Sequence, residues 1–483
     1  MPFAVEFAAM PPNALPTVKG VKRRIVAALG LLLVAAAVAA PPRVVRAQAN
    51  GSNGTALAGN PFADDIAVQA REAFRLKDKA ALFALRQAAA AQAHPLAQWV
   101  EYWELNNRLG EAQQGDFDAF AERWRGTYVE DRLRNDWLLE LGRRRDWANL
   151  RTEFPRFRMN DDREVTCYAL LAAHLAREQE ERAAQTLQPQ QPPREPLHPS
   201  RRERHTAELA AWLAQRDSDD GCQLLAATLA GERAFTAAEL WLGVRAAVEA
   251  NRPRLARERA ALIDANAAVG VEAAFKDPAR LLADLRRGGR TSSASAQPLA
   301  VIALWRLAAA DPDAAAAQIE QHEAQRLPLL ELARAWGGVA RHAALKQHAK
   351  AATFGQRAFA AWDKAVARGR PSTASDIDPL GLATPPQPPR RPHELAFSDE
   401  VLAWTVRAAL RGGNGTPDKA RWALVLRAIE EMSATEQREA TWVYWRARAL
   451  RAGAAPGPEG EGARALARIT LESIAAPLGF YPQ

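Results

Sequence analysis

Two cysteines are the residues whose type offers chemistry most directly in this sequence. Cys167 and Cys222 each lie in a stretch of helical composition, residues 165–171 and 221–225. Neither belongs to a nucleophile motif or has an adjacent histidine, so a catalytic thiol is not expected. A disulfide and a pair of unpaired buried thiols both stay open. Export of the chain, which its amino terminus indicates, and the presence of only two cysteines favour the disulfide. Such a bridge would stabilise the fold by about 4 kcal/mol.

Other kinds of chemical site are missing from the sequence. There is no Gly-rich phosphate loop, no His-Glu-x-x-His motif and no Cys/His cluster with the spacing of metal ligands. The eight histidines are scattered, and His342 and His348 point in different directions if they share one helix. We expect exposed or capping roles for both. The sequence thus predicts no catalytic, cofactor-binding or metal-binding residue, and no cofactor.

The amino terminus has the layout of a secretory signal. Four basic residues at 19–24 precede an apolar run at 25–40, and small residues at 47–49 follow. An uncleaved anchor helix is the alternative, but the run is short for a span of about 20 residues. We therefore expect residues 1–49 to be a cleaved signal peptide, with periplasmic localisation and no stable membrane span afterwards.

Cleavage of the signal peptide would lower the net charge and so change which partners it indicates. The whole chain of 483 residues carries a net charge of +8, and residues 1–49 hold six Lys/Arg and one acid, which leaves +3. A surface of mixed sign does not indicate nucleic acid as a partner. The densest basic run, residues 143–145, is flanked by Glu140 and Asp146 and is interpreted as a solvated turn between two helices.

Almost everything after residue 60 has the pattern of helices. Leu96, Trp99, Val100 and Trp103 recur at spacings of three and four, which makes one apolar stripe after Pro95. Similar stripes follow at 117–124, 133–141 and 147–154, with ends expected at Gly110, Gly142 and Pro155. Short helices in pairs predict stacked hairpins, since one hairpin cannot bury its own stripe. The expected fold is all-α, an irregular α-superhelix (solenoid).

Four segments interrupt this pattern. Pro-rich stretches lie at 188–200 and 370–392, a Gly/Ser/Thr-rich stretch at 288–297, and a Gly/Pro/Glu-rich stretch at 452–463. Such compositions are typical of loops or extended linkers. Because helical patterns resume after each one, they are interpreted as insertions between hairpins.

Several segments resemble soluble lytic murein transglycosylases, periplasmic enzymes that cut peptidoglycan glycan strands without hydrolysis. The resembling segments, in chain order, are 94–103 (HPLAQWVEYW), 132–138 with 144–147, 236–241 (TAAELW), and 442–448 (WVYWRAR) followed by 479–483 (GFYPQ). Together they span most of residues 60–483. The resemblance implies a U-shaped or ring-like superhelix that steers a glycan strand, and a region in which the family can carry a disulfide.

The resemblance also implies a division of the chain. In the family, a linker domain and a lysozyme-like catalytic domain follow the Phe-Tyr element, which here is Phe480-Tyr481. The expected domains are the signal peptide at 1–49, the superhelical domain at 50–440 and its last helices at 441–483. The expectation is a truncated chain that carries the glycan-guiding domain without the catalytic acid.

One dipeptide could be mistaken for the family's catalytic pair. Glu472-Ser473 precedes Phe480-Tyr481 and lacks the Arg-Gln that comes before the catalytic glutamate in the family. A general acid also needs a raised pKa in a sugar cleft. We therefore take Glu472-Ser473 as coincidental.

The expected partners are peptidoglycan glycan strands and, further, cell-wall synthesis proteins. The alternative function is a non-catalytic periplasmic α-solenoid scaffold that binds protein partners. A free-standing enzyme with another site has no residue constellation to support it.

Overall fold

The fold is described from a computed structural model that covers residues 65–187, 201–288, 293–369, 397–411 and 418–475. The expected signal peptide, both Pro-rich insertions and Phe480-Tyr481 lie outside these residues. Every regular element in the described part is helical, which confirms the all-α prediction.

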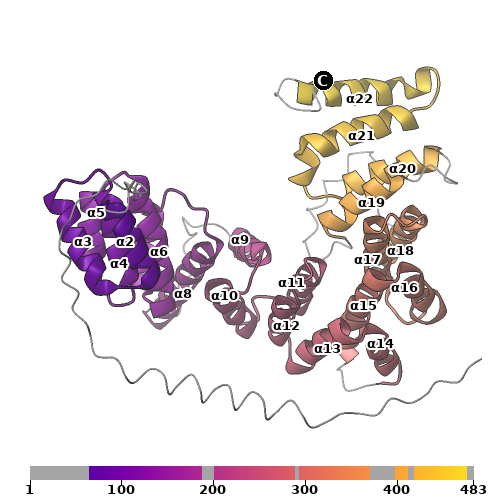
Figure 1. Ribbon diagram of the computed structural model, residues 1–483. Coiled ribbons are helices and arrows are strands. Elements are labelled where there is room, and N and C mark those ends of the chain that lie inside the picture. Colours follow the sequence, from indigo (N-terminus) through magenta and orange to yellow (C-terminus); the bar gives the residue numbers. More distant parts are fainter. Residues whose placement is uncertain (1–64, 188–200, 289–292, 370–396, 412–417, 476–483) are drawn as a thin grey trace, which may run out of the picture. The chain divides into compact units, whose positions relative to one another are not determined.

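The first half of the described chain contains twelve α-helices and one short 3₁₀ helix, η1, after α7 (Figure 1). They are α2 (Ile66–Leu76), α3 (Lys79–Ala91), α4 (Ala97–Asn107), α5 (Gln114–Arg123), α6 (Tyr128–Arg144), α7 (Trp147–Glu153), η1 (Phe154–Arg156), α8 (Arg163–Leu187), α9 (Arg201–Ala214), α10 (Asp220–Gly231), α11 (Ala237–Glu249), α12 (Pro253–Ala261) and α13 (Ala265–Lys276).

The second half continues in the same way, with short single-turn elements between some helices. They are α14 (Pro278–Arg286), α15 (Ser293–Ala310), α16 (Pro312–Gln318), the π-helical turn η2 (Ile319–Glu323), α17 (Leu329–Leu345), α18 (Ala351–Gly369), α19 (Asp399–Arg411), α20 (Asp418–Glu430), η4 (Glu436–Arg438), α21 (Ala440–Gly453), η5 (Pro458–Gly460) and α22 (Glu461–Ala475).

Aspartate and threonine start many of these helices. Their side chains accept hydrogen bonds from backbone N–H groups of the first turn, which otherwise lack partners. The N-cap residues of this kind are Asp65, Asp78, Thr127, Asp146, Asp219, Thr236, Asp264, Asp277 and Asp311. These capping side chains therefore help to define the residue at which each of these helices begins.

The helix ends differ from the expected ones. Helix α4 ends at Asn107, before Gly110, and α6 runs on through Gly142 to Arg144. The left-handed residue that ends α6 is Arg145, with φ 61°. Gly142 is instead a packing position, because a Cβ there would lie 2.4 Å from the ring of Tyr168.

Two further boundaries concern proline. Helix α7 ends at Glu153, and Pro155 lies in the 3₁₀ helix η1 that follows, close to the predicted end. The predicted loop at 288–297 is wrong beyond 292, since α15 starts at Ser293 and contains Pro298. The run Leu299 to Leu304 is buried throughout, and this burial outweighs the cost of the internal proline.

The buried apolar residues form five clusters that follow one another along the chain. The first joins α2 to α4, the second α4 to α8, and the third α8 to α11. The fourth and largest extends from α11 to α19, and the fifth joins α17 to α21. Each helix packs mainly on its neighbours in sequence (Figure 1). This is the packing of a solenoid, as predicted, with Trp137 and Trp212 among the largest buried side chains. The other aromatic residues of the predicted stripes are buried or pack, partly buried, against these clusters, but Leu96 of the first stripe is 45% exposed.

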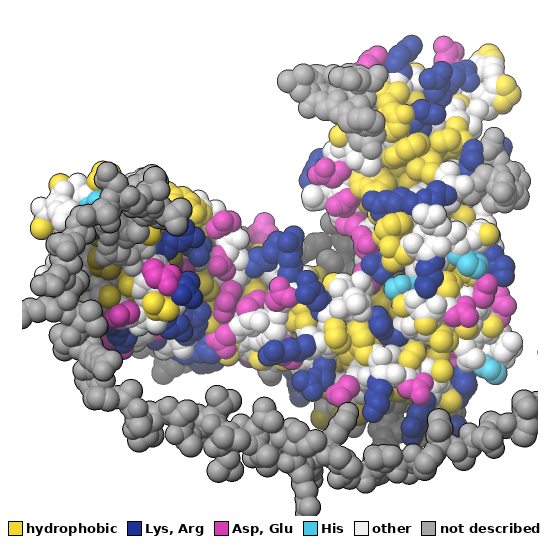
Figure 2. Space-filling view, in the orientation of Figure 1, with side chains coloured by type: hydrophobic (Ala, Val, Ile, Leu, Met, Phe, Trp, Pro, Cys, Tyr) yellow, Lys and Arg dark blue, Asp and Glu magenta, His cyan; other side chains and the backbone are white. Residues whose placement is uncertain are grey.

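The outer surface carries charges of both signs. Figure 2 shows Lys and Arg interspersed with Asp and Glu over the face drawn. Within the described residues, no helix combines the length and the apolar character needed to cross a membrane. The U or ring shape that the family resemblance implies stays a prediction.

Candidate functional site

The structure joins the two cysteines that the sequence singled out. Cys167 on α8 and Cys222 on α10 form a disulfide with Cα atoms 4.9 Å apart, and both residues are fully buried. The disulfide joins residues that are 55 positions apart in the sequence. The pair is interpreted as structural, because both cysteines lie within the apolar cluster that joins α8 to α11.

The Glu472-Ser473 pair lies on α22 and has no site around it. Both side chains are exposed, and the Ser473 hydroxyl donates to the carbonyl of Thr470 at 2.7 Å. An exposed carboxyl on a helix surface is not enclosed in a cleft that could hold a sugar.

The two histidines differ from each other. His348 accepts from the backbone N–H of Lys350 through Nδ1 at 3.3 Å, and its Nε2 lies 3.1 Å from Asp313, which is the expected capping role. His342 on α17 is partly buried instead. Desolvation, with the nearby cations of Arg341, Arg306 and Lys346, lowers its pKa from 6.5 to about 4.

The basic run at 143–145 is more than a solvated turn. Arg144 donates to the carbonyls of Ala112 and Leu109 at 2.8 and 2.7 Å. Arg145 pairs with Asp220 at 2.7 Å, which ties the end of α6 to α10. These arginines hold neighbouring hairpins together, and the sequence interpretation missed this because their partners lie 32 to 75 residues away.

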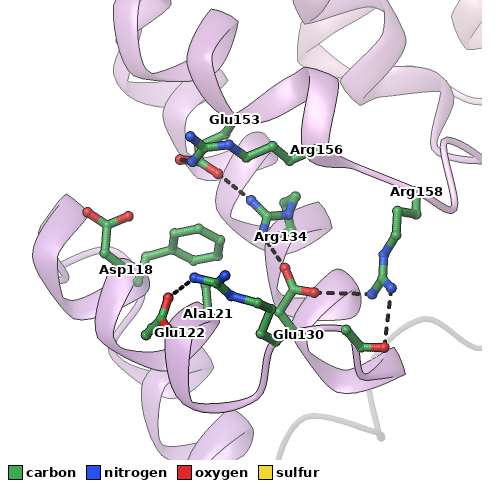
Figure 3. A pocket seen from close by; sticks show the side chains of 11 residues that line it. Asp118, Ala121, Glu122, Glu130, Arg134, Glu153, Arg156 and Arg158 are labelled. Atoms are coloured by element: carbon green, nitrogen blue, oxygen red, sulfur yellow. Dashed lines mark hydrogen bonds and ion pairs between the residues drawn. The ribbon is translucent and has the colours of Figure 1, made fainter.

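A cavity of about 660 Å³ opens between α5, α6 and the turn that contains η1 (Figure 3). Its lining is strongly polar. The charged lining residues are Arg125, Arg134, Arg156, Arg158, Asp118, Glu122, Glu130 and Glu153. Four cations face four anions, so the cavity is formally neutral while it presents many donors and acceptors.

The cavity has a buried ionic floor. Arg134 on α6 bridges Glu130, one turn earlier, and Glu153 at the end of α7. All three side chains are at most 7% exposed. The Arg134 guanidinium also lies 5.2 Å from the centre of the Phe117 ring on α5. Mutual pairing offsets the cost of burying these charges and fixes their positions.

The arginines at the rim of the cavity differ in whether their N–H donors are already engaged by the protein. Arg158 donates to the carbonyls of Gly126 and Thr127 at 3.2 and 2.8 Å, and to Glu130 at 3.1 Å, so its donors are engaged. Arg156 pairs with Glu153 at 3.1 Å and is 60% exposed. Arg125 pairs with Glu122, and its side chain is 75% exposed. Arg125 and Arg156 therefore keep N–H donors that a ligand could reach.

This arrangement suits binding more than catalysis. A glutamate that acts as a general acid must carry a proton, whereas Glu130 and Glu153 both accept from Arg134. A formally neutral cavity with fixed donors and acceptors fits a neutral ligand rich in hydroxyl and amide groups. The sequence did not reveal the cavity, because its residues come from several helices and the turns between them, and each charged residue looks like an ordinary surface charge.

One carboxyl outside the cavity has the raised pKa that acid catalysis requires. Burial raises the pKa of Glu249, at the end of α11, from 4.5 to about 7, against the opposing effects of Ser398, Arg341 and Arg245. Glu249 does not line the cavity described above. We assign it no catalytic role.

Comparison with known proteins gives a likeness in structure alone. No protein-family model matches the chain, and no curated protein matches it. The lytic transglycosylase Slt from Pseudomonas aeruginosa, solved as an inactive mutant, is similar at 19% identity with a TM-score of 0.45. The 70 kDa soluble lytic transglycosylase from Escherichia coli is similar at 16% identity with a TM-score of 0.39, as is a 70 kDa soluble lytic transglycosylase in complex with bulgecin A. Each alignment covers 86% of this chain, which spans only 56% of the length of those proteins, all of them lytic transglycosylases.

Proposed function

We propose that this chain is the superhelical part of a periplasmic lytic transglycosylase and that it holds peptidoglycan glycan strands. In this proposal the chain by itself does not cut glycan, because the residues described above include no carboxyl suited to acid catalysis in a sugar cleft. The amino-terminal segment at 1–49 would direct its export, and the cell wall would be its partner.

The positions of the resembling segments support the proposal. Residues 97–103 lie in α4, where Val100 and Tyr102 are buried. Residues 132–138 lie in α6, and 442–448 lie in α21. Thr236 and Glu239 form the capping box that begins α11. The segments that resemble the family are thus elements that start helices or pack the cores between hairpins.

The cavity at α5 and α6 is the observation that carries the glycan-binding part. It lies beside α6, which bears one of the resembling segments, and its formal charge is zero. Peptidoglycan strands are polymers of amino sugars with hydroxyl and acetamido groups. Such groups need donors and acceptors at fixed positions, which the Glu130–Arg134–Glu153 floor and the exposed Arg125 and Arg156 supply.

Co-sedimentation with purified peptidoglycan sacculi tests this proposal. Loss of two hydrogen bonds from the paired variant Arg125→Ala/Arg156→Ala should weaken binding by about tenfold. The control is Arg254→Ala, since Arg254 is 79% exposed and its ion pair among the described residues is with Glu258 on its own helix. Equal binding by both variants would remove the cavity from the proposal, and no binding by the unmodified chain would favour the protein-scaffold alternative.

A second assay tests the proposal that the chain by itself does not cut glycan. The purified chain is incubated with sacculi, and the soluble products are analysed for anhydro-muropeptides. We expect none above the buffer control. Their release would show that the chain cuts glycan, and Glu249→Gln would then be the first variant to examine.

A further inference from the structure

A cluster of one histidine and three glutamates lies where α8, α9 and α10 meet. His174 and Glu178 are one turn apart on α8, Glu208 is on α9, and Glu232 caps the end of α10. The His174 Nε2 atom lies 2.7 Å from Glu232 and 3.9 Å from Glu178, and Nδ1 lies 3.6 Å from Glu208. The two ring nitrogens therefore face different carboxylates.

We propose that His174, Glu178 and Glu232 bind a divalent transition-metal ion of the Zn²⁺ type, with Glu208 orienting the imidazole ring. One ligand atom from each of the three residues lies within 4.8 Å of the others. A neutral imidazole nitrogen and two carboxylate oxygens are ligands that Zn²⁺ accepts, and water would complete a tetrahedral site.

The two distances from His174 require only small movements. Zn²⁺ bonds of about 2.0–2.2 Å in a tetrahedral site separate neighbouring ligand atoms by about 3.3 Å. The 2.7 Å separation from His174 to Glu232 would widen, and the 3.9 Å separation to Glu178 would shorten, by similar amounts. Glu178 and Glu232 are 26% and 32% exposed, so their carboxylates have room to adjust.

The surroundings distinguish this cluster from a surface group of acids. His174 Nε2 lies 2.7 Å from Glu232, close enough to donate its proton to that carboxylate. A metal ion would replace this proton on Nε2, and the Glu208 carboxylate, 6% exposed and 3.6 Å from Nδ1, would then hold the remaining proton on Nδ1. Arg177 lies 3.4 Å from Glu208 and balances its charge. Arg182 pairs with Oε2 of Glu178 at 2.7 Å, whereas Oε1 of Glu178 faces His174, so the ion would bind at Oε1.

The supporting helices are also fixed. The Cys167–Cys222 disulfide joins α8 to α10, and Cys167 precedes His174 by two helical turns, on the same side of α8. The main contributors to the site therefore sit on two helices that are covalently linked. A ligand set held in this way loses less conformational entropy when it binds an ion.

Metal titration of the full chain tests the proposal, after removal of metals with a chelator. ZnCl₂ is followed by calorimetry, and CoCl₂ by its visible absorption, which reports tetrahedral coordination. We expect one tight site per chain. His174→Ala and Glu232→Gln should weaken binding by at least tenfold, and Glu208→Gln by about tenfold, since it acts on ring orientation.

The matched control is His348→Ala. His348 also pairs with a carboxylate, Asp313 at 3.1 Å, but the Lys350 ammonium group lies 3.0 Å from the same carboxylate. This variant should bind Zn²⁺ like the unmodified chain. Absence of a Co²⁺ absorption band in the unmodified chain would overturn the proposal. An affinity unchanged in both His174→Ala and Glu232→Gln would overturn it as well. Far-UV circular dichroism confirms that each variant is folded. Glu178→Gln, at a ligand that is 26% exposed, should also weaken Zn²⁺ binding.

Discussion

Two partly buried titratable groups, on helices that a hydrogen bond joins, should have opposite effects on how stability depends on pH. Glu249 ends α11, and His342 lies on α17 next to Arg341, whose guanidinium donates to the Glu249 carbonyl at 3.2 Å. Both helices contribute to the largest apolar cluster, so they are expected to unfold together. Burial raises the pKa of Glu249 to about 7 and lowers that of His342 to about 4.

The signs follow from which state holds more protons. Between pH 4.5 and 7 the folded state keeps the Glu249 proton and the unfolded state loses it, so stability falls as pH rises. Between pH 4 and 6.5 the unfolded state protonates His342 and the folded state does not, so stability falls as pH drops. A pKa displaced from 4.5 to about 7, or from 6.5 to about 4, corresponds to about 3 kcal/mol in each case. The two effects cancel in large part over the same range.

Urea unfolding at pH 4 to 7.5, followed by far-UV circular dichroism, measures this for Glu249→Gln, His342→Asn and the double variant. The stability of the unmodified chain relative to Glu249→Gln should fall by about 3 kcal/mol as pH rises from 4.5 to 7. Relative to His342→Asn, it should rise by about 3 kcal/mol between pH 4 and 6.5. Single-variant differences that do not change with pH would refute the reasoning. A double variant whose differences do not add would show that the two groups are directly coupled.

Two more predictions concern the packing of α6, α8 and α10. Gly142→Ala should destabilise the chain by about 1–3 kcal/mol in the same assay, because its Cβ would meet the ring of Tyr168 at 2.4 Å. Gly110→Ala, which meets nothing within 4 Å, is the control and should be nearly neutral. Replacing Cys167 and Cys222 together by Ser should lower stability by about 4 kcal/mol in the chain-entropy model, with reduction by dithiothreitol giving a similar loss. A variant as stable as the unmodified chain would show that the bridge does not form in solution.

The sequence predicted the helices better than it predicted their ends. Apolar residues at spacings of three and four identify α4 and α6 because this spacing follows directly from helix geometry. The ends were misplaced because Gly142 serves a contact with Tyr168, which no local pattern reveals. The left-handed residue that ends α6 is an arginine, Arg145, which then pairs with Asp220 on another hairpin.

The candidate site was harder to predict than the fold. A cavity formed by Glu130, Arg134 and Glu153 depends on α6 and α7 being brought together, and the types of these residues are common on any helix surface. The same is true of His174, whose partners Glu208 and Glu232 lie 34 and 58 positions later in the sequence. Only Glu178, one turn away, could have been noticed from spacing.

The succession of five local cores has a consequence for how such a chain can change in evolution. Because each cluster is built from helices close in sequence, a segment inserted between two of its helices lengthens one connection and leaves the packing of those helices intact. Doubling the length of a connection costs only about 0.6 kcal/mol of closure entropy. In the sequence, the two Pro-rich segments fall between α8 and α9 and between α18 and α19. A solenoid of this kind can therefore acquire new segments between its helices at little cost in stability.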